Sequence, residues 1–261
     1  MKHLKTDRVE LHLGLEKPIK ILHITDIHIS FADDRDEEKW LEFAAHRREI
    51  FFKEGRRPER DPAGYLMEAM EYAKEFDCTV ITGDLIDFNS YANYDAATEI
   101  LAGKDYMFTP GSHEFCPNNF ERKAERWDEM QQLFRGDMEF ESRLVGGVNV
   151  ITMDNSYYVW TQKQFDMLKA EVSRGYPILL FSHVPYDCPF LTHEQTGIVP
   201  PEGAKELTVE MNEYIKNQPL IKGIFTGHYH RLEYVQSGYK PHPCYIGPSL
   251  FTGCVGVITI D

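Results

Sequence analysis

Short apolar segments recur along the whole chain and alternate between strand-like and helix-like periods. Runs of β-branched and aromatic residues that end in polar residues predict six strands, over residues 19–25, 78–82, 105–109, 148–153, 177–182 and 220–226. Smaller strands are expected over residues 232–236, 244–247 and 255–260. Because the strands alternate with helical segments and no internal repeat is present, the pattern is typical of an α/β fold.

Apolar residues at helical spacing fill several of the intervals between these strands. They recur over residues 66–76, 120–130, 165–172 and 204–216. The first of these stretches follows Asp61 and Pro62, which match an N-cap and a first-turn proline. The third follows Thr161 and Gln164, which have the spacing of a capping box. These start signals support the prediction of helices between the strands.

Composition and charge restrict the class of protein. The 261 residues are 42% hydrophobic and 13% aromatic, which is enough material to bury a core, so we expect a single domain over residues 1–261. The chain carries 28 Lys and Arg against 42 Asp and Glu, a net charge of −14. An acidic protein is repelled by nucleic acid and by anionic membrane surfaces, so cations are the natural partners.

The cysteines and the N-terminal residues bear on the compartment. Five cysteines lie far apart and form no Cys-x-x-Cys pair, which argues against a disulfide framework and against a zinc knuckle. The first residues lack the apolar segment of a secretory leader, and no apolar run approaches the ~18 residues that a membrane span needs. We therefore expect a cytoplasmic protein.

Polar motifs stand at or just past the ends of several predicted strands. They are Asp26-Ile27-His28, Gly83-Asp84 with Asp87, Gly111-Ser112-His113-Glu114, Ser182-His183 and Gly227-His228-Tyr229-His230. Since the carboxyl ends of strands in an open α/β sheet converge on one crevice, these residues can meet in space. Each motif alone is a weak signal, because strand ends and turns are ordinarily polar.

Together the motifs predict a metal site. The expected cluster has carboxylates and imidazoles from five segments: Asp26, Asp84, His28, His183, His228 and His230. So many titratable groups would pack poorly in one pocket unless metal ions bound them. Mixed oxygen and nitrogen ligands suit manganese, iron or zinc rather than calcium, which prefers oxygen.

The order of these motifs from Asp26 to His230 resembles that of the calcineurin-like metallophosphoesterase superfamily. The resemblance implies two mixed β-sheets packed as a sandwich and flanked by helices, a four-layer α/β/β/α fold. It also implies a dinuclear metal site at the ends of the strands. The residues that follow Asp87 are Phe88 and Asn89, whereas Ser/Thr protein phosphatases have Arg and Gly there, so that subclass is not expected. Purple acid phosphatases have tyrosine at the position of Asp87, so their iron chemistry is not expected either.

The same resemblance implies a role for each motif residue. The implied metal ligands are Asp26, His28 and His230 at the first ion, His183 and His228 at the second, and Asp84 between them. Ser112 occupies the position of a metal-binding Asn. His113 matches the catalytic histidine and Asp87 the carboxylate that orients it, while Glu114 is expected to support the geometry of the loop.

The implied chemistry is metal-dependent hydrolysis of a phosphate ester. Two cations about 3.5 to 4 Å apart bind phosphate oxygens and lower the pKa of a bridging water, which then attacks as hydroxide. His113 would be the general acid that protonates the leaving alkoxide, and Asp87 would fix its tautomer and favour its protonated form. Either a phosphodiester or a phosphomonoester fits this scheme. A metal-binding scaffold of the same fold with little turnover is the alternative, and a nuclease is a weaker third option because the chain is acidic.

The expected cofactors are two divalent metal ions, with manganese first and iron, zinc or nickel as alternatives. The Ser112 hydroxyl lies closer to Cβ than an Asn carbonyl would, so we expect it to contact the second metal through water or to miss it. That site should then be the weaker of the two. The expected partner is a small phosphorylated substrate, with nucleotides as candidates and no membrane or nucleic acid. The oligomeric state is not indicated.

Residues 31–61 depart from the α/β alternation because they hold ten acidic and eight basic residues. An amphipathic stripe predicts that they form a helical insertion: Trp40, Phe43, Arg47, Ile50 and Phe51. A solvated surface helix is the simpler interpretation, and a lid beside the active site is the sharper one. In the lid interpretation, the basic cluster of Lys53, Arg56, Arg57 and Arg60 would guide an anionic substrate.

Overall fold

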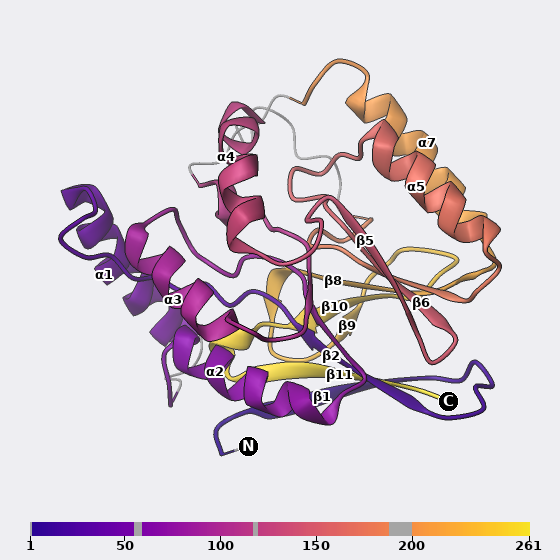
Figure 1. Ribbon diagram of the computed structural model, residues 1–261, viewed down its shortest axis with the longest axis horizontal. Helices are drawn as coiled ribbons and strands as arrows, with labels where there is room; N and C mark the ends of the chain where they lie inside the picture. The colour runs from indigo at the N-terminus through magenta and orange to yellow at the C-terminus, as the bar shows by residue number, and fades with distance from the viewer. Residues whose placement is uncertain (1, 55–58, 117–119, 188–199) are drawn as a thin grey trace.

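Two mixed β-sheets form the centre of the computed structural model, with helices on both outer faces (Figure 1). The structure describes residues 2–54, 59–116, 120–187 and 200–261. One sheet has five strands in the order β1-β11-β2-β3-β4, and the other has six in the order β5-β6-β7-β8-β10-β9. Both sheets combine parallel and antiparallel pairs. The predicted sandwich of two mixed sheets is confirmed.

The five-stranded sheet contains the first part of the chain and its last strand. Its strands are β1 (Lys5–Leu11), β2 (Ile19–Ile24), β3 (Cys78–Ile81), β4 (Met107–Phe108) and β11 (Cys254–Ile260). The sequence pattern did not predict β1, because it is an edge strand in which only Val9 and Leu11 are buried. Strands β2, β3 and β4 are parallel neighbours, so the segments that follow them leave the sheet at the same edge.

The six-stranded sheet contains the rest of the strands. They are β5 (Phe140–Val145), β6 (Val148–Met153), β7 (Ile178–Phe181), β8 (Ile221–Arg231), β9 (Val235–Gln236) and β10 (Cys244–Pro248). The unpredicted β5 is again an edge strand, joined to β6 by Gly146 and Gly147, both of which have positive φ. Strand β8 was predicted to end at residue 226, but it continues to Arg231 and pairs with Pro248 there. Its last residues are polar, which is why the apolar pattern stopped short.

The helices are α1 (Glu38–Glu54), α2 (Pro62–Tyr72), α3 (Tyr91–Leu101), α4 (Phe120–Leu133), α5 (Gln162–Ser173) and α7 (Ala204–Lys216). Short 3-10 turns are η1 (Ala73–Glu75), η2 (His113–Phe115) and η3 (Leu250–Thr252). The predicted start signals are present: Asp61 accepts a hydrogen bond from the Gly64 amide at 2.7 Å, and Thr161 with Gln164 forms a capping box. Helix α3 was not predicted. No helix among the described residues is both long and apolar enough to cross a membrane.

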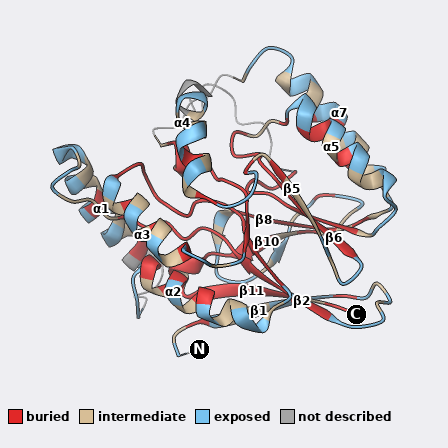
Figure 2. Cartoon of the chain, viewed as in Figure 1, coloured by how far each residue is buried: buried red, intermediate tan, exposed pale blue. Residues whose placement is uncertain are grey.

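Three groups of buried apolar residues separate the layers, and Figure 2 shows them as the red interior of the molecule. One lies between the five-stranded sheet and its helices and includes Leu22 and Leu66. A second lies between the six-stranded sheet and helices α5 and α7 and includes Phe165. The third fills the space between the sheets and includes Phe181 and Phe225. This packing fixes the sheets relative to one another and brings the segments after β2, β3 and β7 together.

Candidate metal centre

The loops after β2 and β3 are held together by their backbones. The amides of Ile27 and His28 both donate to the carbonyl of Asp84, at 2.9 and 2.8 Å. Asp26, His28 and Asp84 all have positive φ, of 50°, 55° and 51°. Such left-handed conformations cost non-glycine residues about 1 to 3 kcal/mol each and concentrate at functional sites. The strained backbone therefore lowers the stability of the fold, and it directs these three side chains to one place.

Glycine is required where the loops after β3 and β4 cross. A Cβ on Gly83, whose φ is +81°, would lie 2.2 Å from the amide nitrogen of Gly111. A Cβ on Gly111 would lie 2.1 Å from Oδ1 of Asp84. The glycines of both motifs thus allow the backbone that carries His113 to pass directly beside the Asp84 carboxylate.

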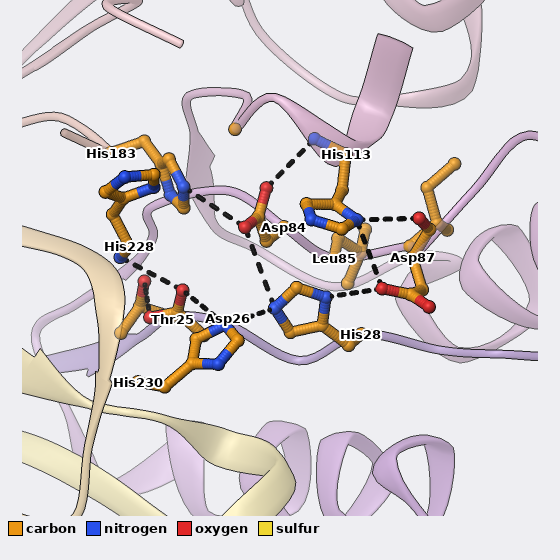
Figure 3. Close-up of polar contacts among 12 residues, drawn as sticks. Thr25, Asp26, His28, Asp84, Leu85, Asp87, His113, His183, His228 and His230 are labelled. Atoms are coloured by element: carbon orange, nitrogen blue, oxygen red, sulfur yellow. Dashed lines mark hydrogen bonds and ion pairs between the residues drawn. The ribbon is translucent and has the colours of Figure 1, made fainter. Parts of the chain in front are cut away.

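Four of the predicted ligands come together at this edge of the sandwich (Figure 3). One ligand atom from each of Asp26, His28, Asp84 and His230 lies within 4.8 Å of the other three. The first three side chains are buried and His230 is partly buried. Nε2 of His28 lies 2.9 Å from Nε2 of His230 and 3.6 Å from Oδ2 of Asp84. Two carboxylates and two imidazole nitrogens at this spacing are a donor set that suits a divalent transition metal.

The predicted ligands His183 and His228 lie beside this group. Nε2 of His183 is buried, has no hydrogen bond, and lies 3.2 Å from Oδ2 of Asp84. Its Nδ1 faces the carbonyl of Thr82 at 2.8 Å, an arrangement that turns Nε2 toward the cluster. Burial lowers the pKa of His183, but the charge and close contact of Asp84, the charge of Asp26 and the Thr82 carbonyl together outweigh burial and raise the pKa to about 10. The site therefore favours a positive charge next to Asp84, and a metal ion can supply it.

His228 is placed less directly than His183. Its ring centroid is 5.3 Å from that of His183, and its amide donates to Oδ1 of Asp26 at 3.0 Å. Its Nε2, however, lies 2.9 Å from the hydroxyl of Tyr158. Burial lowers the pKa of His228 to about 4, which keeps the imidazole neutral, as a metal ligand must be. The sequence pattern did not identify Tyr158 as a neighbour of the site.

His113 begins the turn η2, next to the cluster, with a quarter of its side chain exposed. Its Nδ1 lies 2.7 Å from the carbonyl of Asp87 and 3.1 Å from Oδ1 of the same residue. Its amide donates to Oδ1 of Asp84 at 3.1 Å. Burial opposes a charge on His113, yet Asp84 and Asp87 together raise the pKa to about 9. Ser112 is buried directly before it, at the start of the turn.

Asp87 contacts more groups than the sequence predicted. Its Oδ1 accepts from Nδ1 of His28 at 2.9 Å as well as facing His113, and its Oδ2 accepts from Ser30 at 3.0 Å. It also accepts two hydrogen bonds from Arg47 of α1. Burial raises the pKa of Asp87, but hydrogen bonds from His113, His28 and Arg47 outweigh burial and hold the pKa well below its usual range. One ionised carboxylate therefore orients two histidines of the site.

Glu114 holds the backbone of the site rather than facing the metal ligands. Its fully buried carboxylate accepts hydrogen bonds from the amides of Asp84, Leu85, Ile86 and Gly111, at 2.9, 2.6, 3.2 and 2.6 Å. Burial and the charge of Asp84 raise its pKa, whereas the amides favour its ionised form. This arrangement fits the supporting role that the motif implied.

Two residues of the basic cluster expected to guide a substrate, Lys53 and Arg60, are described, and each lies beside an acidic residue. Lys53 is exposed and pairs with Glu49 at 2.6 Å, and Arg60 lies 3.6 Å from Glu68. Arg56 and Arg57 lie outside the described residues. Among the described residues of the insertion, Arg47 is the basic residue that reaches the site. Arg47 belongs to the amphipathic stripe predicted for this helix, and the sequence pattern indicated no partner for it.

A family model described as calcineurin-like phosphoesterase matches residues 19–232. No curated protein matches the chain. Among solved structures, the chain is similar to a purple acid phosphatase from yellow lupin seeds, with a TM-score of 0.54 and 14% identity over 94% of this chain and 44% of the lupin chain. It is also similar to a dimetal phosphatase from Danio rerio, with a TM-score of 0.49 and 14% identity over 93% and 87% of the two chains. The chain thus spans less than half the length of the lupin protein.

Proposed function

The chain belongs to the calcineurin-like phosphoesterase family, and we propose that it hydrolyses a phosphate ester at a centre of two divalent metal ions. The observation that carries the proposal is the convergence of Asp26, His28, Asp84 and His230, whose ligand atoms lie within 4.8 Å of one another. Three of these residues have buried side chains and a strained backbone, and they lie next to His113. Such an arrangement lowers the stability of the metal-free protein, and a bound cation would offset that loss.

The two ions would share Asp84 in this proposal. Asp26, His28 and His230 would complete the first site, and His183 with His228 the second, with Ser112 at its edge. Manganese is the first candidate, followed by iron, zinc and nickel. When bound, such ions hold the phosphate oxygens and activate a water for attack on phosphorus.

His113 would donate the proton that the leaving group needs. Its Nδ1 is engaged by the carbonyl and the carboxylate of Asp87, so its Nε2 is the atom that can serve a substrate. The charge of Asp87 and its contacts with the ring favour the protonated imidazole, as a general acid requires. Its partial exposure lets a substrate reach the ring while Asp87 stays fully buried.

The substrate would be a small phosphorylated molecule, with nucleotides as candidates. A net charge of −14 disfavours long nucleic acids and anionic membranes, which require a basic surface. A cytoplasmic location, expected from the dispersed cysteines, belongs to the same proposal.

The test is turnover of a chromogenic phosphomonoester and a chromogenic phosphodiester with manganese, iron, zinc and nickel, together with metal analysis of the protein. We expect activity that needs added metal and is abolished in Asp84→Asn, which loses the shared ligand charge. A protein that holds two ions per chain and turns over neither substrate with any metal would contradict the proposal. That result would favour the metal-binding scaffold.

A further inference from the structure

Helix α1 carries an arginine into the site from the charged insertion. Nε of Arg47 donates to Oδ2 of Asp87 at 2.6 Å, and Nη2 donates to Oδ1 at 2.8 Å. The arginine side chain is 18% exposed and the aspartate fully buried. Two parallel hydrogen bonds from one guanidinium fix the plane of a carboxylate, which a single point charge cannot do.

The packing of α1 holds this guanidinium in place. Its Cζ lies 4.5 Å from the ring centroid of Phe51 and 5.9 Å from that of Phe43, the aromatic residues one turn on either side. Phe51 is itself buried, with its ring 5.0 Å from that of His28 and 4.9 Å from that of Phe251. The aromatic face of α1 is therefore packed against the group of predicted metal ligands, and Arg47 is part of that face.

The other contacts of Asp87 show what the two hydrogen bonds from Arg47 can do. Oδ1 is shared by His28 and His113, at 2.9 and 3.1 Å, and both contacts depend on one orientation of the carboxylate. Without Arg47, the two histidines that need orienting would contact Oδ1 and only Ser30 would contact Oδ2, so the group would be freer to rotate about its last bond. Arg47 contacts both oxygens and so prevents that rotation.

We propose that Arg47 is a positioning residue: it holds the Asp87 carboxylate so that one oxygen orients both the metal-ligand face of His28 and the proton-donating face of His113. The inference rests on the proposed function for the roles of these two histidines. Since Nε and Nη2 of Arg47 both donate to Asp87, the residue acts on the two histidines through that carboxylate.

The experiment compares Arg47→Ala and Arg47→Lys with the parent and with Arg48→Ala. Arg48 is the exposed neighbour on the same helix and controls for loss of positive charge from α1. Lysine keeps the charge of Arg47 but cannot make the two-point contact. Each variant is assayed with one substrate that has a poor leaving group and one that has a good leaving group, and its affinity for Mn²⁺ alone is measured by titration calorimetry.

We expect both Arg47 variants to lower kcat for the poor leaving group by about 10- to 100-fold, with a much smaller loss for the good one, because only the former needs the proton of His113. KM should change little. In a His113→Ala background assayed at saturating Mn²⁺, the Arg47 substitution should cause no further loss with the poor leaving group. The tighter Mn²⁺ site should weaken by about tenfold, because His28 loses its fixed orientation. Arg48→Ala should match the parent in every measurement.

Three results would overturn the inference. Arg47→Ala could match Arg48→Ala in both kcat and Mn²⁺ affinity. An equal loss with both leaving groups and a raised KM would identify Arg47 as a substrate clamp. A lower melting temperature with unchanged leaving-group dependence and Mn²⁺ affinity would leave only a structural role. If the parent turns over neither substrate, the proposed function fails, but the Mn²⁺ affinities still decide whether Arg47 positions the cluster.

Discussion

Replacing Glu114 with glutamine tests how the loops that carry Asp84 and His113 are held. In the structure, Oε2 accepts from the amides of Asp84 and Gly111, and Oε1 accepts from those of Leu85 and Ile86. Both carboxylate oxygens are thus acceptors for two amides each. A glutamine has only one such oxygen, and its NH₂ group cannot accept a hydrogen bond.

The magnitude follows from the number of amides left without an acceptor. In either orientation of the glutamine, two buried N–H groups face an NH₂ group and lose their hydrogen bonds. Each buried donor without a partner costs about 1 to 3 kcal/mol, so the free energy of unfolding should fall by about 2 to 6 kcal/mol. Glu99→Gln on the exposed face of α3 is the matched control, and it should change that free energy by no more than about 0.5 kcal/mol.

Unfolding in urea measures the difference. With a slope of about 3 kcal/mol per M, Glu114→Gln should lower the midpoint by about 0.7 to 2 M. The Mn²⁺ affinity should fall in the same variant, because the freed backbone carries Asp84. An unfolding midpoint equal to that of the parent would refute the reasoning, since it would mean that the buried amides of this turn do not need a charged acceptor.

Further substitutions test the site residue by residue. His113→Ala should keep the metal content but lower turnover of a poor leaving group by about 10²- to 10⁴-fold, and activity near that of the parent would remove the imidazole from the mechanism. Ser112→Asn should tighten the weaker metal site in titration calorimetry, because the amide oxygen reaches one bond further; equal affinities at both parental sites would contradict this. Gly227→Ala should abolish high-affinity metal binding, because its Cβ would lie 1.9 Å from Oγ1 of Thr25 and 2.7 Å from Oδ2 of Asp26. Unchanged calorimetry in that variant would show that β8 can shift without cost.

The convergence of the motifs could be predicted because it depends on strand order. Asp26 and Asp84 each follow one of two parallel neighbours, β2 and β3, so a local pattern of apolar run and polar end was enough to bring them together. The edge strands β1 and β5 could not be predicted in this way. Each pairs on one side only, and most of its positions are not buried, so the apolar pattern that marks a strand is weak there.

The contact of Arg47 with Asp87 spans 40 positions, and no local pattern reports a partner at that distance. The density of basic residues around Lys53 suggested a group that guides the substrate. Dense charge is, however, typical of a solvated surface, where each side chain contacts water or an adjacent acidic residue. A more informative signal was the position of Arg47 one turn from Phe43 and one turn from Phe51 on the same helix face. A guanidinium on an aromatic face is partly removed from water, and an unpaired buried charge costs several kcal/mol, so a carboxylate opposite such an arginine is favoured. A charged residue inside an apolar stripe therefore indicates a buried ion pair, whereas charged residues in a dense run indicate a surface exposed to solvent.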